Sequence, residues 1–162
     1  MNARIYNILL LFSLFGIAMW FFGNLYEAVV IGPNMLGNSD VKMRAFRDFF
    51  TSTNPAFFYI PISQLAVLMS IFLYIKTPKE KTALKQSLMR AVIVLVIAMI
   101  ITIYLVTQIN IELFFGDEIL SLKQMMNLAV TWNILNILRI ILAAAALGYM
   151  FKTWSLVQRE KT

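Results

Sequence analysis

The sequence contains neither cysteine nor histidine. Without cysteine there is no thiolate nucleophile, no disulfide and no Cys-x-x-Cys redox pair, and without histidine the usual zinc, copper and haem ligand sets are missing. Any chemistry must therefore rely on carboxylates, amides, hydroxyls, arginine or lysine. The residue types present predict no metal site and no bound cofactor.

Charged residues are also scarce. They make up 14% of the 162 residues, against about 25% in a typical soluble domain, whereas hydrophobic residues make up 60%. A soluble fold could not hide so much apolar surface. The length predicts one domain over residues 1–162, which four membrane-spanning helices and their loops would nearly fill. We therefore expect an all-α protein, a four-helix transmembrane bundle in contact with membrane lipids.

Four long apolar runs give the expected spans, at about residues 6–31, 55–75, 89–109 and 126–152. Each can cross a hydrocarbon core of about 30 Å at about 1.5 Å per residue. The first run has no small-x-small cleavage site, which favours a retained span over a signal peptide, and Gly32 with Pro33 is expected to end it. The second run begins at Asn54 and Pro55 as a capped helix. Pro61 predicts a kink in it, because proline removes one backbone hydrogen bond.

The distribution of basic residues predicts the orientation. The segment between the second and third runs holds five basic residues against one acidic residue, Glu80, and the positive-inside rule places it in the cytoplasm: Lys76, Lys79, Lys81, Lys85 and Arg90. Alternation then puts both termini in the cytoplasm and the acidic segment with Asp117 and Glu118 outside. Orientation in an inner or plasma membrane accounts for the net charge of +6, so nucleic-acid binding is not expected.

The segment between the first and second runs, about residues 32–53, has balanced charges. Within it, five apolar residues share one face at helical spacing: Val41, Ala45, Phe46, Phe49 and Phe50. This pattern predicts a short outer amphipathic helix that lies on the membrane surface or caps the bundle.

Arg139 falls near the middle of the fourth run and is the most informative position in the chain. An ionisable side chain facing lipid costs at least about 2.5 kcal/mol, so Arg139 should face the bundle interior. Trp132, Asn136 and Arg139 are spaced i, i+4 and i+7, which places all three on one side of the helix. Ala143 and Ala146 follow on the same side, where small residues allow close helix approach.

The first run carries a matching stripe, spaced i, i+4, i+7 and i+11: Gly16, Trp20, Gly23 and Glu27. We expect Glu27 to neutralise Arg139, because Glu27 ends this glycine-lined stripe, which can pack against the small residues of the fourth run. Glu112 is the less favoured partner, because it stands in a loop and can stay in water. Asn24, Gln64 and Asn110 add polar groups toward the same half of the bundle. Together these residues predict a polar cavity that opens outward. The alternative is a purely helix-joining role for polar side chains. It stays open for Arg139 with Glu27, and it is favoured for two other residues of the runs: Thr102 and Asn133.

Three short motifs resemble the anthrone oxygenase-like family of four-span membrane proteins, which in bacteria is a domain of unknown function. The motifs are Gly23-Asn24-Leu25-Tyr26-Glu27 leading to Pro33, then Asn110 with Glu112, and finally Trp132-Asn-Ile-Leu-Asn136-Ile-Leu-Arg139. Together they cover nearly the whole chain. The resemblance implies a four-helix membrane bundle and, from the fungal members, oxygenation of polycyclic anthrones to anthraquinones without a metal or organic cofactor.

On this resemblance, an apolar polycyclic or quinone-like substrate would enter from the membrane. Glu27 or Glu112 would remove an acidic C–H proton, and Arg139, helped by Asn136 or Asn110, would stabilise the enolate while molecular oxygen reacts. Six residues would bind the substrate: Trp20, Asn24, Gln64, Asn110, Trp132 and Asn136.

A non-catalytic function is the alternative. In that case the chain binds a lipid-like or quinone-like molecule, with Arg139 anchoring an anionic or carbonyl group, or it serves as a partner subunit in an envelope complex. A transporter or channel fits less well, because four spans in one copy form a narrow path and the sequence shows no inverted repeat of broken helices. The sequence leaves the oligomeric state open.

Overall fold

Helices make up nearly all of the described structure. The computed structural model describes residues 2–36, 45, 48–49, 55–115 and 120–159. The helices are α1 (Ala3–Tyr26), η1 (Glu27–Ile31), α2 (Gly32–Met35), α4 (Pro55–Lys76), α5 (Thr82–Tyr104), η2 (Leu105–Phe115) and α6 (Leu122–Arg159), where η marks a π-helix. Within these residues there is no β-strand, which confirms the all-α prediction. The predicted outer helix over residues 41–50 falls largely outside the described residues.

Four helical segments are long and apolar enough to cross a membrane. They are Ala3–Met35, Phe57–Lys76, Thr82–Phe115 and Leu122–Arg159, with 33, 20, 34 and 38 residues. At about 1.5 Å per residue, even the shortest matches a hydrocarbon core of about 30 Å. The chain is therefore a multi-pass membrane protein, with the four spans that the apolar runs predict.

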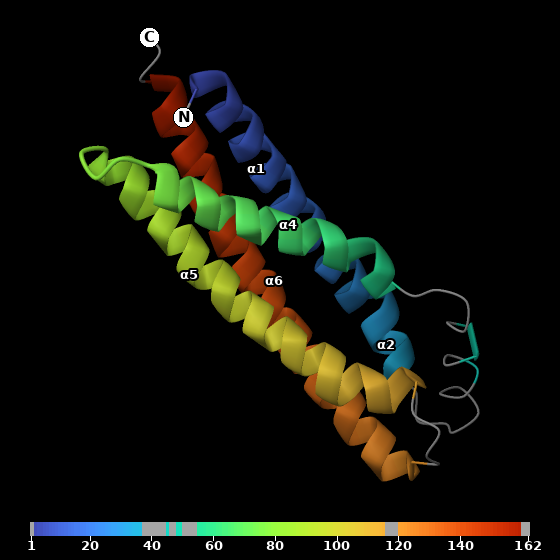
Figure 1. Cartoon of the computed structure of the whole chain (residues 1–162). Coiled ribbons are helices and arrows are strands. Elements are labelled where there is room, and N and C mark those ends of the chain that lie inside the picture. Colours follow the sequence, from blue (N-terminus) through green and yellow to red (C-terminus); the bar gives the residue numbers. More distant parts are fainter. Residues whose placement is uncertain (1, 37–44, 46–47, 50–54, 116–119, 160–162) are drawn as a thin grey trace.

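The spans form an up-and-down bundle (Figure 1). α1 packs against α4 and α6, and α5 packs against the same two helices, so the contacts close a ring in the order α1, α4, α5, α6. Each helix is antiparallel to both of its neighbours in this ring. The N-terminus, the C-terminus and the α4–α5 turn consequently lie at one end of the bundle, and α2 lies at the other (Figure 1).

Two apolar clusters fill the interior, one toward each end. The cluster at the terminal end is built around residues such as Leu10, Leu88 and Met150. The cluster at the other end is built around residues such as Met35 and Ile109. Between them, along three of the spans, the chain places buried polar side chains: Asn24 and Glu27 on the first, Thr102 on the third, and Asn136 and Arg139 on the fourth. The bundle therefore has a polar layer between two apolar layers.

Two glycines let α1 approach α4 closely. A Cβ atom added to Gly16 would lie 2.7 Å from the Cβ of Ala66, and one added to Gly23 would lie 2.5 Å from the ring of Tyr59. Real Cβ atoms do not make such short contacts, so a side chain at Gly16 would require the two helices to separate, and one at Gly23 would require the Tyr59 ring to move. Both glycines of the stripe thus face α4, whereas the stripe was expected to pack against the small residues of the fourth span.

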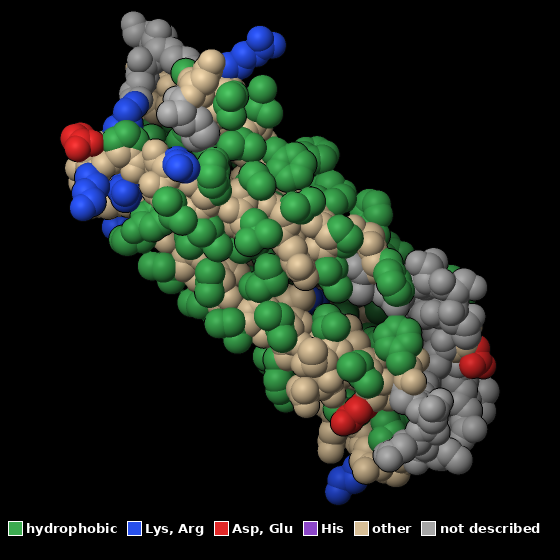
Figure 2. Space-filling model, viewed as in Figure 1, with side chains coloured by type: hydrophobic (Ala, Val, Ile, Leu, Met, Phe, Trp, Pro, Cys, Tyr) green, Lys and Arg blue, Asp and Glu red, His purple; other side chains and the backbone are tan. Residues whose placement is uncertain are grey.

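Large apolar side chains cover the outside of the bundle (Figure 2). Phe15 is 66% exposed, Ile100 60% and Ile134 62%, and each lies on a different span. In water, an apolar surface of this extent would promote aggregation. In a bilayer the acyl chains contact it, which agrees with the assignment of the four spans.

The helices run further than the apolar runs indicate. Gly32 and Pro33 do not end the first span, because α2 continues the helical path, and Pro33 lies in its first turn, where the missing N–H is tolerated. The third span begins at Thr82 rather than near residue 89 and continues through η2. Lys85 and Arg90 therefore belong to α5 and not to the loop. Hydropathy marks the part of a helix that lies in lipid, whereas polar first turns extend beyond it.

α4 continues through Pro61. Proline has no N–H, so the carbonyl of Phe57 loses its usual helical donor. Nearby, the hydroxyl of Ser63 donates to the carbonyl of Ile60 at 3.1 Å. The bend expected at Pro61 stays a prediction.

Candidate functional site

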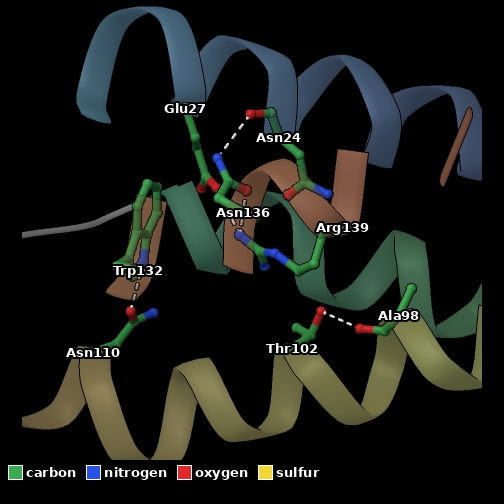
Figure 3. Close-up of polar contacts among 8 residues, drawn as sticks. All are labelled: Asn24, Glu27, Ala98, Thr102, Asn110, Trp132, Asn136 and Arg139. Atoms are coloured by element: carbon green, nitrogen blue, oxygen red, sulfur yellow. Dashed lines mark hydrogen bonds and ion pairs between the residues drawn. The ribbon is translucent and has the colours of Figure 1, made fainter. Parts of the chain in front are cut away.

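An ion pair joins the first and last spans inside the bundle. Arg139 Nη2 on α6 donates a hydrogen bond to Glu27 Oε2 at 3.3 Å. The two residues are 6% and 9% exposed, and Figure 3 shows their side chains directed toward each other. The prediction that Arg139 faces the interior and pairs with Glu27 is confirmed. Either charge alone would be strongly disfavoured at this depth.

Asn136 completes the link between α6 and α1. Its Oδ1 accepts a hydrogen bond from Arg139 Nη2 at 2.7 Å, and its Nδ2 donates to the main-chain carbonyl of Asn24 at 3.1 Å (Figure 3). Asn136 is fully buried. One amide therefore supports the guanidinium and also fixes the position of α6 against α1.

A second polar contact joins α6 to the third span. Trp132 Nε1 donates a hydrogen bond to Asn110 Oδ1 at 3.0 Å. Asn110 was expected to contact Arg139, but it is engaged with the indole in this structure. Thr102 lies nearer the centre of the same span, and its hydroxyl donates to the carbonyl of Ala98 at 2.8 Å. These bonds place polar side chains from α5 and η2 opposite the ion pair (Figure 3).

These groups surround a cavity in the polar layer. Residues from all four spans line it: Trp20, Asn24, Glu27, Tyr59, Ile60, Ser63, Thr102, Val106, Asn110, Trp132 and Arg139. Its volume is about 40 Å³, which is room for about three water molecules. Figure 2 shows a hollow in the face formed by α4 and α5, with atoms of a basic side chain at its floor. Among the described residues that line the cavity, Arg139 is the basic one. The cavity therefore opens sideways between α4 and α5, and not outward as expected.

Two buried donors at this cavity lack a hydrogen-bond partner among the described residues: Arg139 Nε and Asn24 Nδ2. Asn24 is 2% exposed, and its side chain extends from α1 toward Arg139 (Figure 3). Leaving a buried N–H without an acceptor costs about 1–3 kcal/mol. The site is therefore equipped to bind an acceptor atom.

Two π-helical segments adjoin the site. Glu27 is the first residue of η1, and Asn110 lies within η2. A π-helix has wider turns than an α-helix, so it shifts which side chains face the bundle interior, and π segments occur frequently at functional sites. The sequence pattern gave no sign of either segment.

The structure brings together most of the residues expected at the site. Six of them line the cavity: Trp20, Asn24, Glu27, Asn110, Trp132 and Arg139. Asn136 does not line it but accepts a hydrogen bond from the Arg139 guanidinium. Gln64 and Glu112 are exposed on the surface and are not among the residues that line the cavity. The roles proposed for all these residues in binding or catalysis remain predictions.

Several lining residues were not expected there. Thr102 was expected to join helices, Tyr59 and Ser63 were not singled out, and Ile60 and Val106 are ordinary apolar residues of their spans. A signal for Tyr59 existed, because Gly23 on the facing stripe leaves room for a ring. Nothing in the sequence marks the other four.

The fold and the site together define a multi-pass helical membrane protein with a polar site inside its bundle. Within the described part of the chain, there is no group of three or more acidic, histidine or cysteine side chains placed to hold a metal ion. Comparisons with family models, with curated proteins and with solved structures each give no match. The resemblance to the anthrone oxygenase-like family therefore stays a prediction that rests on the three motifs.

Proposed function

We propose that this protein binds, within the membrane, the carbonyl group of an apolar molecule such as a quinone. The observation that carries the proposal is the pair of unpartnered donors, Arg139 Nε and Asn24 Nδ2, on two buried residues of one cavity. A carbonyl oxygen can accept from both. Both donor atoms are buried and so are not hydrogen-bonded to bulk water. Because buried donors are normally paired, a bound acceptor is favoured.

The size of the cavity supports the binding of one polar group rather than a whole molecule. Its volume of about 40 Å³ is far below the 300 Å³ or so at which ligand pockets usually begin. A carbonyl fits into this space, and a ring system does not. The rest of the molecule would lie in the lateral opening between α4 and α5, beside the apolar side chains that the second and third spans contribute to the lining, Ile60 and Val106.

Charge favours a neutral ligand. Arg139 is already neutralised by Glu27 at 3.3 Å. A carboxylate or phosphate would bring a second anion into a site of low dielectric constant, where it would compete with Glu27 for the guanidinium. A ketone or quinone carbonyl gains the hydrogen bonds without this penalty.

Tryptophan fluorescence can test the proposal directly, because Trp20 and Trp132 both line the cavity. Titration of the purified protein with menadione, a quinone that quenches indole emission, should give saturable quenching. Asn24→Leu should raise the Kd obtained from this quenching about tenfold or more, as expected for one lost hydrogen bond to a buried group. Gln64→Leu is the matched control, because Gln64 is exposed and outside the cavity.

Equal quenching of the wild-type protein and the Asn24→Leu variant would overturn the proposed site. So would linear, unsaturable quenching, since that is collision within the detergent or lipid.

We also propose that the α4–α5 turn and both termini face the cytoplasm, in an inner or plasma membrane. Lys79, Lys81 and Lys85 at or near this turn support the orientation, because short cytoplasmic loops are enriched in basic residues. The arrangement of the bundle supports it as well, since the two termini lie at the same end as this turn.

Oxygenation of an anthrone is the second candidate function, and one observation favours it. The ion pair uses only one oxygen of Glu27, Oε2, which leaves Oε1 to accept a proton. Removal of a proton from the methylene carbon, which lies across the central ring from the anthrone carbonyl, gives an enolate whose oxyanion the Arg139 guanidinium would stabilise. Reaction with molecular oxygen then yields anthraquinone and water, which balances the atoms.

Oxygen uptake measures this second candidate. Wild-type protein supplied with anthrone should consume oxygen faster than membranes without it, and Glu27→Gln should abolish the excess. Glu112→Gln, at an exposed carboxylate outside the cavity, should leave it unchanged. Uptake that Glu27→Gln leaves intact would rule out this carboxylate as the base.

A further inference from the structure

A second cavity lies at the other end of the bundle, beside the α4–α5 turn. Its volume is about 320 Å³, and six residues line it: Tyr74, Lys79, Thr82, Lys85, Gln86 and Met89. We call this cavity the turn groove. Among the described residues that line it are two lysines and no acidic residue, which makes it a site of positive charge at the membrane surface.

One of these lysines is held in place by the fold. Lys85 Nζ donates a hydrogen bond to the carbonyl of Thr77 at 3.0 Å and lies 5.3 Å from the centre of the Tyr74 ring. The Thr77 carbonyl belongs to the end of α4, and the ring supplies a cation–π contact. An ammonium has three N–H donors, so one bond to the protein leaves capacity for an anion. Lys79 is exposed and adds a second charge from the turn itself.

An apolar track leads away from the turn groove along the outer face of α5. Met89, Ile93, Val96 and Ile100 are spaced i, i+4, i+7 and i+11, and their exposed fractions are 39%, 51%, 39% and 60%. The track begins in the turn groove at Met89 and runs toward the membrane centre. A ligand that contacts both the lysines of the turn groove and this apolar track must have an anionic head and a long apolar tail.

A neighbouring cavity at the same end lacks this combination. It has a volume of about 440 Å³ and includes Lys81 and Arg159, but Glu80 also lines it. A carboxylate there would repel a phosphate. Basic residues that only set the orientation of the protein in the membrane need not lie together in one groove. Lys79 and Lys85 both line the turn groove.

We propose that the turn groove binds one anionic phospholipid, with its phosphate between Lys79 and Lys85 and an acyl chain along the track from Met89 to Ile100. Charge complementarity selects an anionic lipid over a zwitterionic one, because each lysine near a membrane surface contributes about a fivefold gain in affinity for negative charge. This site is independent of the cavity at Arg139.

Native mass spectrometry of the purified protein with added phosphatidylglycerol or phosphatidylcholine tests the proposal. The wild-type protein should retain phosphatidylglycerol preferentially. The double variant Lys79→Gln/Lys85→Gln should lose this preference by about 25-fold, which is the product of two single-lysine contributions of about fivefold. The single variant Lys79→Gln changes only an exposed side chain and should lose about fivefold, so the test stands even where the double variant does not fold.

The matched control is Lys76→Gln/Lys152→Gln, which removes two exposed charges at the same end but outside the turn groove. It should keep the preference for phosphatidylglycerol. An equal loss in both double variants would overturn the proposal, because the attraction would then belong to the whole surface. Displacement of the lipid by millimolar glycerol phosphate would also overturn it, since a bare head group lacks the tail that the track binds.

Discussion

Arg139 Nη2 lies 3.3 Å from Glu27 Oε2, and these two residues stand 112 positions apart in the chain. The contact therefore links the first and last spans across the polar layer. Asn136 accepts a second hydrogen bond from the same guanidinium nitrogen at 2.7 Å, so the charge is shared between two acceptors on two helices. Burial makes each charge dependent on the other, because neither is exposed to bulk water at this depth.

The first prediction concerns this dependence. Arg139→Ala should lower the free energy of unfolding by about 3–5 kcal/mol, because it leaves the Glu27 carboxylate buried without a cation. The double variant Arg139→Leu/Glu27→Leu should recover much of this loss, since it removes both charges and keeps the volume apolar. Reversible unfolding in mixed micelles measures both values. A double variant no more stable than Arg139→Ala would show that the pair itself, and not the orphaned charge, sets the stability.

Much of the fold follows from the sequence. Length and hydropathy predict four spans, and the structure has four in the expected places, because a bilayer requires about 20 apolar residues per helix. The ends of the helices were not predictable in this way. Lys85 and Arg90 look like loop residues by polarity, yet both lie on α5. Long basic side chains can reach the membrane surface from the first turns of a helix, so polarity does not mark where the helix begins.

The site was predicted in part, for a physical reason that differs between residues. Glu27 and Arg139 were expected to meet because two charges in lipid each need a partner, and both charges can be recognised from the sequence alone. Gln64 was placed at the site by depth alone, but the direction of a side chain depends on helix rotation, and its side chain is exposed. The contact of Asn110 with Trp132 depends on the π-helical turns of η2, which hydropathy does not reveal.

The second prediction uses the glycines of α1 and α6. Gly16→Ala should destabilise the bundle by about 1–3 kcal/mol, because its new Cβ would lie 2.7 Å from Ala66 Cβ and the two helices would have to separate. Gly148→Ala is the control, since no atom lies within 4 Å of its added Cβ. That change should be neutral or stabilise the helix by up to about 1 kcal/mol. Equal destabilisation of both variants in the same unfolding measurement would contradict the close α1–α4 contact.

The third prediction separates the two asparagines of the site. Asn136→Leu should lower the free energy of unfolding by about 1.5–3 kcal/mol, because Asn136 accepts from the charged guanidinium of Arg139. Asn110→Leu should cost only about 0.5–1.5 kcal/mol, because its partner, the Trp132 indole, is neutral. The order of the two losses is the decisive result. If Asn110→Leu proved the more costly, Arg139 would not be the centre of the polar layer.

The last prediction concerns orientation, and the absence of native cysteine makes it simple to test. Glu80→Cys places a thiol in the α4–α5 turn, and Lys123→Cys places one at the opposite end, in the first turn of α6. Both residues are exposed. A membrane-impermeant maleimide added to intact cells should label the variant at position 123 and should label the variant at position 80 only after permeabilisation. The two substitutions remove an acidic residue from the inner side and a basic residue from the outer side, so they strengthen the existing charge asymmetry and cannot invert the protein by the positive-inside rule. Labelling of position 80 from outside would place both termini outside as well, because they lie at the same end of the bundle as the turn.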